Sequence, residues 1–342
     1  MRLGRSLVAA AVCCLECAAT VTLAAERHAA AVASQTFRVS TAHGPASVPF
    51  LISLDWSQPQ PRISRAVIVF HGVGRDVNGY YRTVQDAAER ADAASRDTIF
   101  IAPQFLDEED IREHHLGKDM LRWRRVAWEA GAPAAAPSPI SSYEVVDDLL
   151  TRLADRSLFP NINTVVLAGH SGGGQLVQRY AVAGKAAAGL ESAGIHIRYV
   201  IANPSSYLYF SDGRPAAGGV RCRDFNHWKY GPVDPPAYVK DGESTWPQRE
   251  ASYAQRDVIY LLGTADIDPH ERDLDVSCAA ETQGPTRFVR GRAYFAYLHA
   301  RHPAGWNQRM WFVPGVPHSA RQMFTSACGV SALFDAGACV DQ

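Results

Sequence analysis

Residues 165–181, VVLAGHSGGGQLVQRYA, form the stretch that decides the fold. An apolar run leads into four glycines grouped around Ser171, and a run with helical spacing follows. Fixing a glycine backbone costs more conformational entropy than fixing any other residue, so this grouping needs a structural reason. A sharp strand-to-helix turn supplies one, because side chains two positions before and after the serine would collide, and Gly169 and Gly173 occupy those positions. The pattern therefore predicts a G-x-S-x-G nucleophile elbow that projects the Ser171 hydroxyl above a sheet.

Two other structures also use glycines in this way: a plain glycine-rich turn and a phosphate-binding loop at a helix N-terminus. A P-loop would require Gly-Lys-Ser or Gly-Lys-Thr, and the stretch contains neither. The strand pattern before Ser171 and the helical pattern after it favour the elbow over the plain turn.

Short apolar runs alternate with amphipathic runs along the chain, which predicts an α/β fold with a mostly parallel sheet covered by helices on both faces. The predicted strands are 46–56, 65–72, 97–105, 163–169, 197–204, 256–263 and 309–315. The predicted helices are 80–95, 141–160 with Ser142 as its cap, 173–187 and 289–303, whereas 26–45 predicts a loose arm and 106–140 irregular structure. Ligands of such sheets bind at the carboxyl ends of the strands, so the residues after each strand are the candidate site.

A serine hydroxyl needs a general base, and that base needs a carboxylate to orient it. In this arrangement the three groups follow in the order serine, acid, histidine. Asp266 lies in the loop after the strand 256–263, and Asp268 is the alternative acid two residues on. His318 follows the last strand. Order and placement predict a catalytic trio of Ser171, Asp266 and His318.

Catalysis also needs N–H donors for the developing oxyanion. The loop after the first buried strand begins His71-Gly72-Val73, and its glycine allows a close backbone approach. We predict the N–H groups of Val73 and Gly172 as the two donors. His71 is expected to hold this loop by hydrogen bonds, and His170 to line the pocket floor, because adjacent side chains diverge in a sharp turn.

These motifs resemble those of the α/β-hydrolase superfamily of serine esterases and lipases. The resemblance rests on His71-Gly72-Val73, the elbow at 169–173, Asp266 and His318, and it covers residues 46–325. The stretches ISSYEVVDDLL, GHSGGGQLVQRYA and IANPSSYLY resemble a group of poorly characterised bacterial and fungal serine hydrolases. The similarity to polyester depolymerases and feruloyl esterases is limited to the HG loop and the elbow. By this resemblance Ser171 is the nucleophile, His318 the base and Asp266 its partner, while glycine at 172 departs from the usual alanine or larger residue.

The segment 204–255 has no clear periodicity and is predicted to be a cap over the site, since long loops usually carry function. Its aromatic residues, with Tyr207 and Trp228 as the candidate substrate contacts, would line an apolar pocket. The alternative is that these aromatic side chains form the small core of the segment itself.

Residues 1–25 begin with arginines, continue through an apolar run and end in small residues, which is the layout of a secretory signal peptide. The chain is therefore predicted to be secreted or periplasmic, without stable membrane insertion. Four cysteines remain after this segment, and an even number in an exported chain favours disulfides. We favour Cys222–Cys278 and Cys328–Cys339, the second closing a C-terminal tail at 326–342.

The net charge and the spacing of possible metal ligands limit the partners and cofactors to expect. The net charge is −1 and no basic block is present, so nucleic acid is not an expected partner. No metal ligand spacing is found, and neither a metal nor a cofactor is expected. The sequence predicts an exported serine hydrolase acting on small-molecule or polymeric carboxylic esters. An amidase, peptidase or acyltransferase with the same trio, and an inactive binding protein on a hydrolase scaffold, remain the alternatives.

Overall fold

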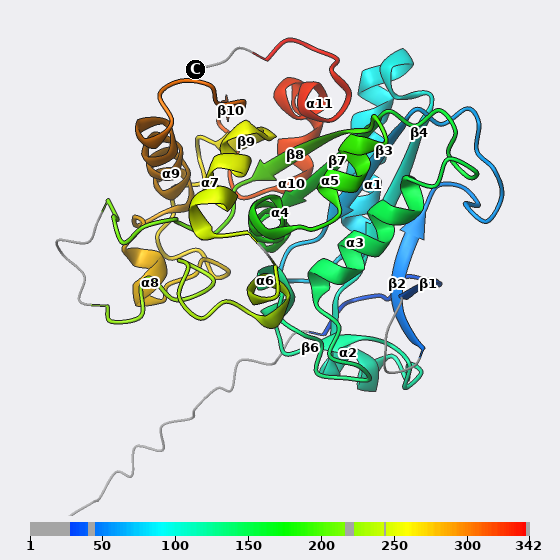
Figure 1. Ribbon diagram of the computed structural model, residues 1–342, viewed down its shortest axis with the longest axis horizontal. Coiled ribbons are helices and arrows are strands. Elements are labelled where there is room, and N and C mark those ends of the chain that lie inside the picture. The colour runs from blue at the N-terminus through cyan, green and yellow to red at the C-terminus, as the bar shows by residue number, and fades with distance from the viewer. Residues whose placement is uncertain (1–27, 40–44, 216–221, 243, 340–342) are drawn as a thin grey trace, which may run out of the picture.

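The structure is a computed structural model that describes residues 28–39, 45–215, 222–242 and 244–339. Its centre is an eight-stranded sheet in the order β1-β2-β4-β3-β7-β8-β9-β10 (Figure 1). From β4 to β10 all neighbouring strands are parallel, whereas β1 pairs with β2 and β2 with β4 in antiparallel fashion. The strands are β1 (Gln35–Val39), β2 (Ala46–Ile52), β3 (Arg65–Phe70), β4 (Thr98–Pro103), β7 (Thr164–His170), β8 (His196–Ala202), β9 (Asp257–Gly263) and β10 (Gln308–Val313).

Side chains alternate along each strand, so the central strands feed two separate cores. In β3, Val67 and Val69 face one core while Ile68 and Phe70 face the other. Helices α1 (Val77–Ala91), α10 (Ala320–Thr325) and α11 (Ala327–Phe334) cover the first face. The opposite face carries α3 (Ser142–Leu153), α4 (Gly172–Ala183), α5 (Ala187–Ser192), α7 (Trp246–Gln255) and α9 (Arg287–Arg301) (Figure 1). The predicted α/β architecture with helices on both faces is confirmed.

Several local predictions need correction. The arm predicted at 26–45 contains β1. The irregular region 106–140 contains β5 (Leu106–Asp107), α2 (Glu108–Glu113), β6 (Arg122–Trp123) and η2 (Ala127–Ala130). The helix predicted at 141–160 ends at Leu153, and its cap is Ser141 instead of Ser142, because Ser141 and Glu144 form a reciprocal capping box.

The segment between β8 and β9 contains α6 (Ala237–Lys240) and α7. The remaining short elements are η1 (Asp92–Ser95) and α8 (Cys278–Glu281). The region predicted as a C-terminal tail contains α11, whose Leu333 and Phe334 are buried in the core beside β4 and α1.

Both predicted disulfides are present. Cys222 is bonded to Cys278, with Cα atoms 5.6 Å apart, and ties the β8–β9 segment to α8. Cys328 is bonded to Cys339, with Cα atoms 4.6 Å apart, and closes the chain after α11. Two disulfides fit an oxidising compartment. The predicted signal peptide lies outside the described residues, and no helix within the described ranges has the length and apolar character needed to span a bilayer.

Candidate active site

Ser171 stands in a strained turn between β7 and α4. Its backbone angles are φ 58° and ψ −120°, which residues with a side chain rarely adopt. The turn is held by hydrogen bonds from the Ser171 N–H to the Ala202 carbonyl and from the Gln175 N–H to the Ser171 carbonyl, both 3.0 Å long. The structure therefore contains the sharp reversal that the glycine pattern predicts.

Gly169 and Gly173 lie where backbone segments meet. A Cβ on Gly169 would collide with the carbonyl of Gly173, and a Cβ on Gly173 would collide with the carbonyl of Phe70 at the end of β3. Both obstacles are backbone and cannot rotate aside. These two glycines therefore let β3, β7 and α4 approach closely enough to form the elbow.

Gly173→Ala is expected to destabilise the fold by about 3 kcal/mol, because the methyl group forces the backbones of β3 and α4 apart. The measurement is urea unfolding of the purified protein. Gly189→Ala in α5 is the matched control, since a Cβ there meets no atom within 4 Å, and this variant should be as stable as the wild type or slightly more stable. Equal midpoints for Gly173→Ala and the wild type would contradict the packing argument.

His318 is paired with Asp266. The His318 Nδ1–H donates to Asp266 Oδ2 at 2.7 Å, since a carboxylate can only accept, and this bond leaves Nε2 as the basic nitrogen. Asp266 follows β9 and is 3% exposed, while His318 follows β10 just before α10. Asp268, the alternative acid, accepts a hydrogen bond from the backbone N–H of His270 on the surface. The structure therefore pairs His318 with the first of the two candidate carboxylates.

Arg287 is a buried neighbour of Asp266 that the sequence did not indicate. Its Nη1 lies 3.5 Å from Asp266 Oδ1, and its Nη2 lies 2.7 Å from Glu271 Oε2. The side chain is fully buried at the first residue of α9, where a single arginine carries no recognisable signal in the sequence. Arg287 thus places a buried positive charge against the Asp266 carboxylate.

His170 lies beside the catalytic candidates, as its place next to Ser171 predicts. Its ring centroid is 4.4 Å from that of His318, and its Nδ1 lies 3.3 Å from the Tyr80 hydroxyl. Burial, and then electrostatic interaction with the neighbouring His318 and Arg287 side chains, hold the pKa of His170 well below its usual value. His170 therefore stays neutral and forms a wall of the pocket. Tyr80, in the first turn of α1, is a pocket residue that no sequence pattern indicated.

His71 holds the HG loop, as predicted. Its Nε2 accepts from the Phe105 N–H at 2.9 Å, so its Nδ1–H donates to the Gly72 carbonyl at 2.8 Å. Burial lowers the pKa of His71 to about 4, which keeps the imidazole neutral. Within the described ranges, no hydrogen bond uses the N–H of Val73 or of Gly172, the two predicted oxyanion donors.

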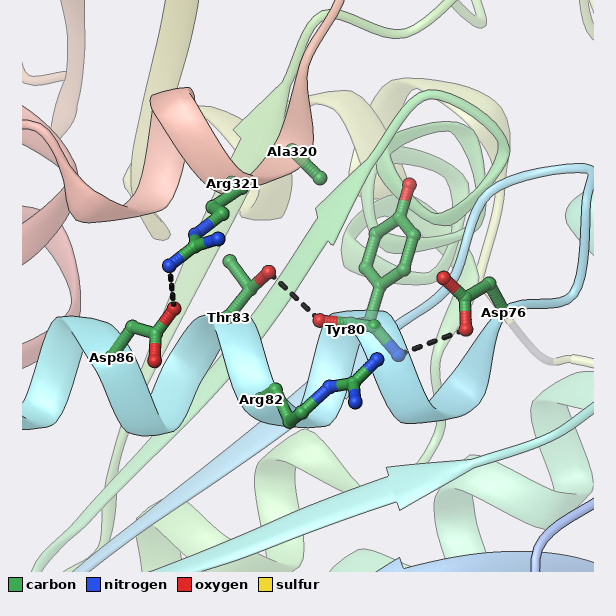
Figure 2. Close-up of a pocket in the computed structure, with 8 residues that line it drawn as sticks. Asp76, Tyr80, Arg82, Thr83, Asp86, Ala320 and Arg321 are labelled. Atoms are coloured by element: carbon green, nitrogen blue, oxygen red, sulfur yellow. Dashed lines mark hydrogen bonds and ion pairs between the residues drawn. The ribbon is translucent and has the colours of Figure 1, made fainter.

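A hollow of about 230 Å³ joins the loop, the elbow and the histidines. It is lined by Gly72, Val73, Gly74, Arg75, Asp76, Tyr80, His170, Ser171, Asp273, His318 and Ala320. Three of these residues, Asp76, Tyr80 and Ala320, also line a neighbouring hollow of about 470 Å³ over α1. Figure 2 shows Tyr80 and Asp86 along α1, with Arg321 of α10 reaching Asp86 at 3.0 Å. A polar groove therefore continues outward from Ser171.

Two predicted substrate contacts lie elsewhere. Tyr207 is fully buried and stacks on Tyr294 with ring centroids 4.6 Å apart, so it belongs to the core and does not line the Ser171 pocket. Trp228 packs near Trp246, and its Nε1–H donates to the Ala130 carbonyl at 2.7 Å. Neither residue lies in a separate core of the segment, as the alternative interpretation expects; both pack the segment against the sheet domain.

Within the part of the chain that the structure describes, no group of three His, Cys, Asp or Glu side chains is arranged to hold a metal ion. Glu129 of η2, which lies next to Gly172 and was not singled out by any motif, is instead held by hydrogen-bond donors.

Comparisons with known proteins bear on the fold. No protein-family model and no curated protein sequence matches the chain. A solved poly(3-hydroxybutyrate) depolymerase from Bordetella parapertussis is similar with a TM-score of 0.59 at 23% identity, over 88% of this chain and 90% of that one. A poly(aspartic acid) hydrolase from Sphingomonas sp. KT-1 is similar with a TM-score of 0.56 at 20% identity, over 85% of this chain and 96% of that one. Together with the sheet order and the elbow, these similarities show that the chain has the α/β-hydrolase fold.

Proposed function

We propose that the chain is an exported serine hydrolase that cleaves carboxylic esters through an acyl-enzyme. The observation that carries this proposal is the 2.7 Å hydrogen bond between His318 and Asp266 beside a strained Ser171 in the same pocket. An imidazole oriented by a buried carboxylate next to a projecting hydroxyl is the arrangement that activates a serine. Export is supported by the predicted leader at 1–25 and by the two disulfides.

The proposed reaction follows from these groups. Ser171 Oγ attacks the ester carbonyl while His318 Nε2 takes its proton, and Asp266 stabilises the resulting imidazolium. The N–H groups of Gly172 and Val73 donate to the oxyanion. His318 then gives the proton to the leaving alcohol, which leaves an acyl group on Ser171. Water, activated by the same imidazole, releases the acid and restores the serine.

A fluorophosphonate probe tests the proposal, because it labels only an activated serine. We expect one adduct per chain, located by mass spectrometry on the peptide that contains Ser171. Absence of labelling in folded protein would favour the alternative, a binding protein on a hydrolase scaffold, and would contradict the proposal.

A substrate panel separates ester from amide cleavage. It should contain p-nitrophenyl esters of increasing acyl length, the matching anilides, an oligomer of 3-hydroxybutyrate and an oligomer of aspartate, since two proteins of the same fold are named for such polymers. We expect kcat/KM to be highest for an ester. A higher value for the matching anilide would reassign the chain as an amidase with the same residues.

A further inference from the structure

A charged cluster that the proposed reaction does not use lies beside the elbow. Glu129 of η2 is 1% exposed, and its Oε2 accepts from Gln175 Nε2 at 3.0 Å and from Lys229 Nζ at 3.3 Å. Its Oε1 is buried without a hydrogen-bond partner. A buried carboxylate normally satisfies both oxygens, so the position of this unsatisfied oxygen calls for a reason.

The unsatisfied oxygen lies against Gly172. A Cβ on Gly172 would be 2.5 Å from Glu129 Oε1, so a side chain at this position would collide with the carboxylate. Since a Cβ lies about 2.5 Å from its own backbone nitrogen, Glu129 Oε1 is within about 5 Å of the Gly172 N–H. A negative charge at this distance opposes the formation of an oxyanion on the same N–H unless a positive charge compensates it.

Lys229 supplies that positive charge. Its Nζ is 3.3 Å from Glu129 Oε2 and also 3.3 Å from Asp275 Oδ2, and the side chain is 19% exposed. Burial lowers the pKa of Lys229, but the carboxylates of Glu129 and Asp275 outweigh it and raise the pKa above its usual value, so the ammonium stays charged. A second cation, Arg179, donates to Gln175 Oε1, to Ser206 and, through Nε at 2.9 Å, to the backbone carbonyl of Lys229 itself. It therefore helps to hold Lys229 in place, while the ion pair with Glu129 is made by the Lys229 ammonium.

Lys229 belongs to the segment between β8 and β9, not to the sheet domain that carries the elbow. The segment is seated on η2 through the neighbouring Trp228, whose Nε1–H donates to the Ala130 carbonyl. The Cys222–Cys278 disulfide holds the same segment to α8. The lysine therefore reaches Glu129 only while the segment is docked.

We propose that Lys229 is a positioning residue of the reaction: its ammonium neutralises Glu129 behind the oxyanion site, so that catalysis requires the β8–β9 segment to be seated on η2. The inference rests on the proposed ester cleavage through Ser171. It assigns the segment an electrostatic role in the chemical step, in place of the apolar substrate pocket predicted from its aromatic residues.

The test changes the charges of Lys229 and Glu129, singly and together, in the full mature protein. Lys229→Met should lower kcat for a p-nitrophenyl ester about 10- to 100-fold and change KM less than about threefold, because the loss falls on the transition state. Glu129→Gln added to Lys229→Met should recover most of kcat, and Lys229→Arg should keep it. Lys240→Met is the control, since Lys240 is an exposed lysine of the same segment.

Two further measurements separate this role from a structural one. Affinity for a phenylboronic acid, which forms an anionic tetrahedral adduct with serine, should fall in Lys229→Met and recover in the double variant. Active sites are counted with the fluorophosphonate probe, so a purely structural lysine would lower the melting temperature while kcat per labelled site stays unchanged.

The outcomes that overturn the inference are distinct from failure of the proposed function. Suppose that the wild type is labelled and active. If Lys229→Met then keeps its kcat, or if the double variant does not recover kcat, the inference is wrong and the proposed function stands. If Glu129→Gln raises KM only for esters that carry an ammonium group, the carboxylate recognises substrate and the inference is also wrong. If the probe does not label the wild-type protein, the proposed function itself is wrong.

Discussion

Ser171→Ala is expected to lower kcat for a short p-nitrophenyl ester about 10⁴- to 10⁶-fold, the largest effect of any single substitution in the chain. The hydroxyl is the only atom that forms the covalent intermediate in the proposed reaction, and water attacking directly is a much poorer nucleophile in this pocket. KM should change little, since the pocket walls keep their positions.

The fold of this variant should be unaffected, because Ser171 is held by its backbone and its side chain makes no hydrogen bond to the helix that follows. Ser192→Ala at the exposed end of α5 is the matched control for removing a hydroxyl, and it should retain full activity. Residual activity of Ser171→Ala within tenfold of the wild type would show that another residue carries the reaction.

The parts of the fold that the sequence predicts well are those whose signal is local. Each buried parallel strand is a short apolar run bounded by turn residues, and the elbow needs glycines at fixed positions around Ser171. Asp266 could be favoured over Asp268 because it lies closer to the end of β9, and the structure gives it the bond to His318. Such features depend on spacing along the chain, which the sequence contains in full.

Short elements stabilised by distant partners were not predictable. Strand β1, QTFRV, is mostly exposed and gains its structure from pairing with β2. Helix α2, EEDIRE, has no apolar stripe and is instead held by a capping box between Asp107 and Asp110. The buried carboxylate of Asp110 also pairs with Arg75. Their stability comes from tertiary contacts, which override weak local patterns.

The same reason explains the side chains around the site that sequence reasoning missed. Tyr80, Glu129 and Arg287 come from three separate elements and meet the catalytic candidates only in the folded chain. Tyr207 was assigned to the pocket because aromatic residues in a long loop suggest a binding site. It follows β8 closely, however, and packs in the core against Tyr294. Aromatic content alone does not distinguish a binding wall from a core.

Asp266→Asn should lower kcat about 10³- to 10⁴-fold, whereas Asp268→Asn, the same change two residues away, should leave it unchanged. The Asp266 carboxylate accepts the Nδ1–H of His318 and thereby fixes the tautomer in which Nε2 is the base. An asparagine can present its amide NH₂ to Nδ1, which stabilises the tautomer with the proton on Nε2 and removes the base. Asp268 instead accepts a hydrogen bond from the backbone N–H of His270 at the surface.

The difference in kcat between the two variants should not come from a loss of folding stability. Arg287 keeps its 2.7 Å ion pair with Glu271 when asparagine replaces Asp266. Melting temperatures of both variants check this point, and the rate of fluorophosphonate labelling reports the activation of Ser171 independently of any substrate. Labelling should slow in parallel with kcat for Asp266→Asn alone. Equal losses in the two variants, or a loss only in Asp268→Asn, would mean that the carboxylate orienting His318 during catalysis is not the one that pairs with it in this structure.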